Sequence, residues 1–301
     1  MTAAVPTPHL TTRSYGRQVQ RVLWITLTLN FAVALAKLVV GLLTHSLTLV
    51  SDAAHSAVDG VNNIVGLVAV GLASKEADAD HPYGHSKYET LAAFVLSGLL
   101  FFTCLEIALS AIRRLFGTPE TPPIATPLSF VVAIGTLAVN FGVARYEGRR
   151  GRELNSDFLI ADAAHTRSDI LVTATVVSSL LLVRFGYSRV DAALSLVIAA
   201  FIGRIGYSVF RRTLPVLVDA SAVDEVHVED IVRAVPGVRS VHAVRSRRVG
   251  TEVFLEMHLV VDPTDTVTDH ARTEAVEAAL EGAFGPVRAT IHVETSRDCG
   301  L

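Results

Sequence analysis

The chain has 301 residues, of which 50% are apolar and 18% are charged, and its formal net charge at pH 7 is −3. Soluble domains carry about 25% charged residues, so this composition argues against a single soluble enzyme fold. Residues 1–212 hold 18 Lys and Arg against 14 Asp and Glu, whereas residues 213–301 hold 8 against 15. The sequence therefore predicts an apolar first part and an acidic soluble tail, and the tail lacks a basic cluster that would bind nucleic acid.

Six apolar stretches are each long enough to cross a bilayer as a helix, which takes roughly 20 residues. They are residues 21–44, 46–73, 89–113, 126–145, 156–184 and 189–211. If the N-terminus is cytoplasmic, the segments on that side hold eleven Lys and Arg and the outer loops hold four. Because cytoplasmic loops are enriched in Lys and Arg, we expect residues 1–20 and the C-terminus inside a plasma (inner) membrane.

Residues 213–301 have the pattern of a soluble α+β domain. The expected elements are a helix over 224–235, strands over 238–248 and 252–262, a helix over 267–284 and a strand over 288–294. This αββαβ order predicts a small ferredoxin-like sheet with its helices on one face. Alternation in the second strand places Leu255, Met257 and Leu259 on the packed face and His258 on the other.

The second and fifth apolar stretches contain the same charged motif. DAAHSAVD starts at Asp52 and DAAHTRSD starts at Asp162, so the pattern DAAHxxxD recurs after 110 residues. Helical geometry places the two aspartates and the histidine of each motif on a single stripe. Since carboxylates inside a bilayer are rare unless they face a partner or water, the two stripes are expected to face each other.

The two stripes together offer four nitrogen and oxygen ligands. These are His55, Asp59, His165 and Asp169. Such a set matches a tetrahedral divalent cation, with zinc as the leading candidate, and leaves cobalt, cadmium, nickel, iron(II) and manganese open. The alternative is a pair of hydrogen-bonded helix contacts without metal, which the repetition of the motif disfavours. We interpret Asp52 and Asp162 as groups that orient the imidazoles or form part of a proton path.

Several other polar residues lie within the apolar stretches. They are Asn30, Lys37, Asn62, Glu106 and Asn140. Hydrogen bonds between helices, or side chains that reach the membrane surface, explain such residues more often than transport does.

The chain resembles the cation diffusion facilitators, a family of homodimeric zinc/proton antiporters, over about residues 15–295. The segments that carry this resemblance are SDAAHSAVD (51–59), HPYGHSKYE (81–89) and ADAAHTRSDIL (161–171). It assigns the transport site to the four ligands named above. Some bacterial relatives with broader selectivity carry Asp at the position of His55, so the histidine here favours zinc.

The resemblance also implies metal sites outside the bilayer. One lies in the cytoplasmic loop at Asp78, His81 and His85, unless HPYGH merely forms a capped turn. Others lie in the tail, where bound zinc would help to hold two copies together, at His242, His258, His270, His292 and Glu294. A relative in this family carries Asp where this chain has Glu294. The alternative interpretation of the tail histidines is that they are solvated surface residues without metal. A further dimer contact is implied near Lys87, which could pair with Asp219.

The expected function is efflux of a divalent cation, zinc first, by proton antiport with alternating access. No GxxxxGK[ST] phosphate loop occurs in the sequence, so ATP is not the expected energy source. Protons compete with metals because imidazole and carboxylate must lose protons to bind them. The alternatives are a membrane metal sensor that binds without transport and a transporter selective for Fe²⁺, Cd²⁺, Co²⁺ or Mn²⁺. An intramembrane metal hydrolase is disfavoured because HExxH is absent, so we expect no enzyme.

Overall fold

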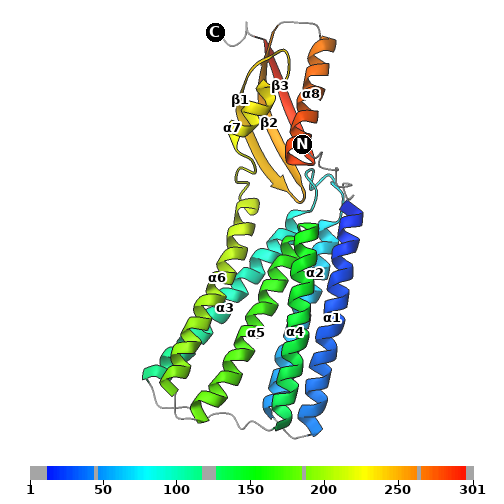
Figure 1. Ribbon diagram of the computed structural model, residues 1–301. Helices are drawn as coiled ribbons and strands as arrows, with labels where there is room; N and C mark the ends of the chain where they lie inside the picture. The colour runs from blue at the N-terminus through cyan, green and yellow to red at the C-terminus, as the bar shows by residue number, and fades with distance from the viewer. Residues whose placement is uncertain (1–11, 44–46, 117–126, 185–187, 263–265, 296–301) are drawn as a thin grey trace, which may run out of the picture. The chain divides into compact units, whose positions relative to one another are not determined.

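The computed structural model describes residues 12–43, 47–116, 127–184, 188–262 and 266–295. The chain divides into a helical unit, Leu10–Thr213, and a second unit that contains Leu214–Leu301. The helical unit is built from six long helices that run alongside one another (Figure 1). They are α1 (Thr12–Leu43), α2 (Leu47–Ala73), α3 (Lys87–Phe116), α4 (Pro127–Leu154), α5 (Asp157–Arg184) and α6 (Ser188–Leu217). Each of the six expected stretches is therefore helical.

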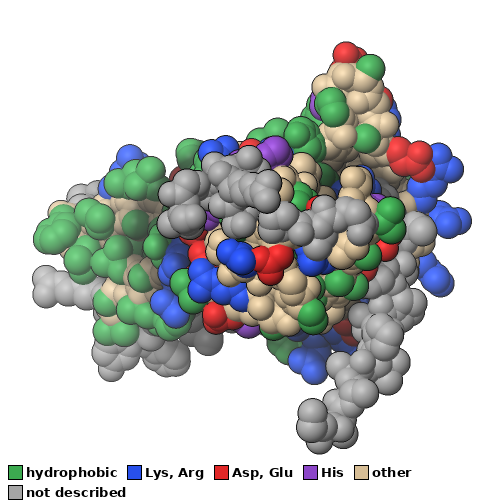
Figure 2. Space-filling model, turned by 90° about the horizontal axis from the view of Figure 1, so that it is seen from above, with side chains coloured by type: hydrophobic (Ala, Val, Ile, Leu, Met, Phe, Trp, Pro, Cys, Tyr) green, Lys and Arg blue, Asp and Glu red, His purple; other side chains and the backbone are tan. Residues whose placement is uncertain are grey.

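Four helical stretches of the described chain are long and apolar enough to cross a membrane. They are Arg13–Leu43, Asp52–Ala73, Lys87–Phe116 and Val190–Leu217. Their outward side chains include Trp24, Phe31 and Phe102, which are 59%, 67% and 61% exposed. Hydrophobic side chains gather on parts of the molecular surface in the space-filling view, as expected of a surface that lipid covers (Figure 2). For α4 and α5, a membrane-spanning role stays a prediction.

The helices α2 and α5 approach each other closely at a glycine. A Cβ atom added at Gly66 would lie 2.2 Å from Cε1 of Phe158, whose side chain is fully buried. Any larger residue at this position would force the buried ring of Phe158, or the helix that carries it, to shift. Gly66 thus allows the two motif-bearing helices to lie side by side.

The second unit has the expected αββαβ order. Its elements are α7 (Glu225–Arg233), β1 (Val238–Val249), β2 (Glu252–Val261), α8 (Thr266–Phe284) and β3 (Val287–Thr295). The strands lie in the order β1-β2-β3, with β2 antiparallel to β1 and parallel to β3. A ferredoxin-like domain has a βαββαβ order with one more strand at its start, so the ferredoxin-like topology stays a prediction for the described residues.

The two faces of this sheet differ as the alternation predicts. Leu255, Met257 and Leu259 of β2 are at most 1% exposed. They pack against buried residues of α7 and α8, among them Val232 and Leu280. The helices therefore cover this face, and the intervening side chains such as His258 lie on the face that the helices leave open.

Candidate metal centres

Three of the four expected intramembrane ligands lie together between α2 and α5. Nε2 of His165 is 3.5 Å from Oδ1 of Asp59 and 3.9 Å from Oδ2 of Asp169. One ligand atom from each residue lies within 4.8 Å of the others. Two ligands bound tetrahedrally at about 2.0–2.1 Å from zinc stand roughly 3.3 Å apart, so a single cation fits this group after a small contraction.

The fourth expected ligand, His55, lies on α2, but its side chain is outside the described part of the chain. His55 precedes Asp59 by four residues, so helical geometry places the two on the same face of α2. Nδ1 of His165 is buried and has no hydrogen-bond partner among the described residues. The participation of His55 therefore stays a prediction.

The cluster contains an amide that the sequence reasoning assigned to helix packing. Nδ2 of Asn62 lies 3.2 Å from Nε2 of His165. Asn62 follows Asp59 by three residues and so shares its stripe on α2, which is the signal that could have revealed it. The amide of Asn62 lies beside Nε2 of His165, the nitrogen that the two carboxylates also face. It can therefore help to orient the imidazole of His165.

The leading aspartates of the two motifs have different partners. Oδ2 of Asp52 forms an ion pair with Nζ of Lys37 at 2.9 Å, and the same ammonium donates to Oγ of Ser56 at 2.9 Å. The side chain of Lys37 is only 5% exposed and bonds across to α2, so of the two expectations for such residues it follows the first, a hydrogen bond between helices. Asp162 accepts a hydrogen bond of 2.8 Å from Nδ2 of Asn63. An imidazole-orienting role for Asp52 stays a prediction, since the His55 side chain is not described.

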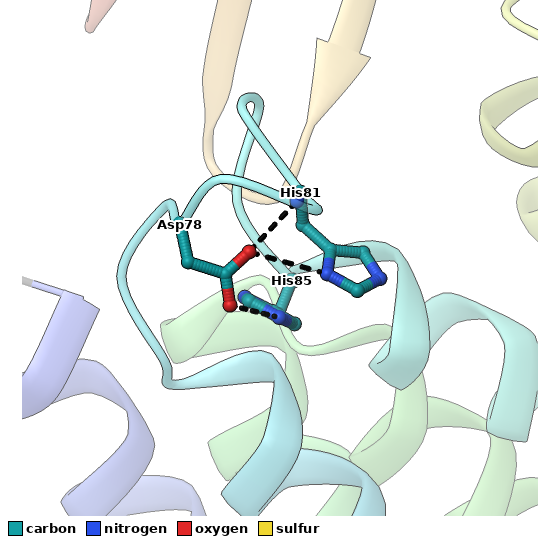
Figure 3. A group of neighbouring side chains, drawn as sticks. All are labelled: Asp78, His81 and His85. Atoms are coloured by element: carbon teal, nitrogen blue, oxygen red, sulfur yellow. Dashed lines mark hydrogen bonds and ion pairs between the residues drawn. The ribbon is translucent and has the colours of Figure 1, made fainter.

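A second group lies in the loop between α2 and α3, where the carboxylate of Asp78 is turned toward two imidazoles (Figure 3). Its Oδ1 is 3.3 Å from Nδ1 of His81, and its Oδ2 is 3.4 Å from Nε2 of His85. The two imidazole rings are 4.3 Å apart. Oδ1 also accepts a 2.7 Å hydrogen bond from the backbone N–H of His81, so the capped turn and the close approach of the three side chains coexist, and metal binding there stays a prediction.

This turn leads to a prediction for the loop. The backbone N–H of His81 holds the pKa of the Asp78 carboxyl below its usual value. Because the pKa of Asp78 is lower in the folded protein, its ionised carboxylate stabilises the turn at pH values above the unfolded pKa of about 3.9. This stabilisation is lost as the pH falls through the folded pKa. At neutral pH, Asp78→Ala is therefore expected to speed hydrogen exchange at the His81 amide, as measured by mass spectrometry or NMR. Asp80→Ala is the control, and equal exchange in both variants would contradict the assignment.

A third group lies on the open face of the tail sheet. His242 of β1 pairs in register with His258 of β2, which pairs with His292 of β3. Nδ1 of His258 is 2.7 Å from Oε1 of Glu294, and Nε2 of His242 is 3.6 Å from Oε2 of the same residue. Nε2 of His292 lies 4.0 Å from Oε1 of Glu294. The register thus brings four of the five expected tail residues together.

The fifth tail residue, His270, lies elsewhere. It belongs to α8, on the helical side of the sheet, and its side chain is 73% exposed. Its Nε2 is 3.4 Å from Oε1 of Glu274, one helical turn further along. The structure of a single chain therefore does not bring His270 to the group on the open face, because the sheet separates the two layers.

Known proteins share both units of this chain. Residues 23–218 match the family model described as the cation efflux transmembrane domain, and residues 220–296 match the cation efflux protein cytoplasmic domain. An uncharacterized transporter of Methanocaldococcus jannaschii is 32% identical over 281 residues, which cover 92% of this chain and 99% of that protein. The magnetosome protein MamB of a Magnetospira species is 28% identical over 280 residues, covering 90% and 94% of the two chains. The cation-efflux pump FieF of Shewanella oneidensis is 26% identical over 278 residues, covering 89% and 93%.

The helical unit, its ligand cluster and these matches define a membrane protein of the cation-efflux class. The chain belongs to the cation diffusion facilitator family, which confirms the resemblance found in the sequence.

Proposed function

We propose that this protein exports divalent cations, zinc first, by exchange for protons. The observation that carries the proposal is the meeting of Asp59, His165 and Asp169 between α2 and α5. Their side chains are only 12–19% exposed, so a cation there is largely removed from solvent. Imidazole and carboxylate ligands without sulfur suit zinc, and a neighbouring histidine at position 55 would complete a tetrahedral set.

Protons are the proposed driving ion. Moving a divalent cation out of a negative interior costs about 4.6 kcal/mol per 100 mV, twice the value for one charge, so export needs an energy source. The ligands of the cluster must be deprotonated to bind zinc, and incoming protons displace it. A cluster between two helices can be opened to either side of the membrane by their reorientation, which is the basis of alternating access.

We further propose that both termini are cytoplasmic in a plasma membrane and that the protein is a homodimer. The match of residues 220–296 to a cytoplasmic domain of cation efflux proteins supports the side assigned to the tail. The tail group of His242, His258 and Glu294 and the loop group around Asp78 offer further zinc sites. A contact of Lys87 with Asp219 across the dimer is part of the same proposal.

Zinc flux into proteoliposomes under an imposed pH gradient tests this function. Zinc is expected to move in the direction opposite to the protons. Its flux should stop when an ionophore collapses the pH gradient. A protein that binds zinc stoichiometrically but carries no flux would be a membrane sensor instead. Competition by Fe²⁺, Cd²⁺, Co²⁺ and Mn²⁺ in the same assay establishes the preferred metal.

The side-chain amide of Asn62 gives a prediction with a smaller expected effect on zinc binding. Asn62→Leu removes the polar group 3.2 Å from Nε2 of His165 and is expected to weaken zinc binding by roughly 10-fold, since groups that orient metal ligands contribute 10–100-fold. Competition with a fluorescent zinc chelator measures the change. Asn140→Leu on α4 is the matched control, and an unaltered affinity in Asn62→Leu would remove Asn62 from the site.

A further inference from the structure

A buried carboxyl on α4 has no role in the function proposed so far. Glu147 is 0% exposed, and both of its carboxyl oxygens lack a hydrogen-bond partner among the described residues. The groups that face it from other helices are Thr26 of α1 and Asp162 and Thr166 of α5. A carboxylate that no donor stabilises is strongly disfavoured in such a place.

The neighbouring hydroxyls are engaged as donors elsewhere. Each threonine has one hydroxyl proton, and both are already used. Thr26 donates to the backbone carbonyl of Leu23 at 3.2 Å, and Thr166 donates to that of Asp162 at 3.1 Å. With no hydrogen-bond donor assigned to either of its oxygens, a neutral, protonated Glu147 is favoured over an ionised one.

Close packing of α4 on α5 keeps solvent away from this carboxyl. A Cβ added at Gly148 would lie 3.5 Å from Cβ of Ala163, and one at Gly151 would lie 3.0 Å from Cγ1 of Ile160. The basic side chains Arg152 and Arg167 lie against Gly148, but neither bonds to the carboxyl of Glu147.

The titratable group beside Glu147 is Asp162, which is 3% exposed. It accepts one hydrogen bond of 2.8 Å from Asn63, whose own carbonyl oxygen accepts one of 2.8 Å from Asn30. Two carboxyl groups in one buried site cannot both be ionised at little cost, so one of the two is expected to hold a proton. A protonated Glu147 also provides the second donor that Asp162 can accept from.

This pair lies next to the cation cluster. Asp162 precedes His165 by three residues, so both lie on the same face of α5. The charged groups of the cluster that act on Asp162 are His165 and Asp59. A divalent cation bound there adds two positive charges about one helical turn away, which favours an ionised carboxylate over a protonated carboxyl.

We propose that Glu147 and Asp162 form a proton-binding site, distinct from the cation ligands, that releases a proton to solvent when the cation binds and regains it when the cation leaves. The inference rests on the proposed antiport function and names residues that take part in its proton exchange.

The test counts the protons released per zinc ion by the full-length protein, using titration calorimetry in buffers of different ionisation enthalpy. Glu147→Gln keeps the shape of a protonated carboxyl but has no proton to release, so the count is expected to fall by about one. Glu153→Gln is the matched control on the same helix, at an exposed carboxylate paired with Arg149 and Arg150, and should leave the count unchanged. An unchanged count in Glu147→Gln would overturn the inference while leaving zinc transport intact.

A measurement on the parent protein decides the matter even if the variant does not fold. Infrared difference spectra between zinc-bound and zinc-free protein are expected to lose a protonated-carboxyl band, and this band should shift when glutamate is labelled with ¹³C. A spectrum without such a glutamate band would overturn the inference. A parent protein that binds no zinc would instead overturn the proposed function, and the inference with it.

Discussion

Asp169→Ala is expected to weaken zinc binding at the intramembrane cluster by at least about 100-fold and to abolish pH-driven zinc flux. Structural zinc sites bind with about 10–16 kcal/mol, so one of four ligands accounts for roughly 3 kcal/mol, which corresponds to about 100-fold. The variant also removes the negative charge that lies 3.9 Å from Nε2 of His165. Flux into proteoliposomes and zinc titration of the same preparation measure the two effects.

Two controls make this result specific to the cluster. Glu153→Gln removes a carboxylate elsewhere in the helical unit and should leave the flux unchanged. Zinc bound at the tail group of His258 and Glu294 should persist in Asp169→Ala, so total binding falls by one ion per chain and not to zero. If Asp169→Ala carried zinc at the parent rate, the assignment of the transport site would be wrong.

The second large effect concerns stability and comes from the ion pair between α1 and α2. Asp52→Ala leaves the ammonium of Lys37, only 5% exposed, without its carboxylate. Removing one partner of a fully buried pair typically destabilises a protein by about 3–5 kcal/mol, because the remaining charge is uncompensated, and since Asp52 is 45% exposed the loss here should lie at or below the lower end of that range. We therefore expect the thermal unfolding temperature of Asp52→Ala in detergent to fall clearly below that of the parent.

The reverse change should be milder. Lys37→Met leaves Asp52, whose side chain is 45% exposed and therefore much less buried than that of Lys37. The double variant Lys37→Met/Asp52→Ala removes both charges and is expected to recover most of the stability lost in Asp52→Ala alone. If the stability lost in the double variant equalled the sum of the losses in the two single variants, the ion pair would not stabilise the protein in this way.

The repeated motif illustrates how far periodicity alone can lead. Because an α-helix has 3.6 residues per turn, the spacing within each motif is enough to place Asp59 on one defined stripe and His165 and Asp169 on another. The alternation of β2 likewise predicted the packed face with Leu255 and the open face with His258, and the burial of Leu255 confirms it. In both cases the information is local, since neighbours on one helix or strand decide which side chains share a face.

Which faces meet is a property of the tertiary structure. The burial of Lys37 against α2, the place of Asn62 beside His165 and the separation of His270 from the tail group depend on how whole elements pack. Glu147 is the strongest example, because nothing near it in the sequence indicates that α4 carries this carboxyl to Asp162 on α5. The sequence by itself determined the helices, the order of helices and strands along the chain and the candidate ligands on each element. Only close packing, such as that of Gly66 on Phe158, decided which of these stripes face each other, because it depends on side-chain volumes from segments far apart in the chain.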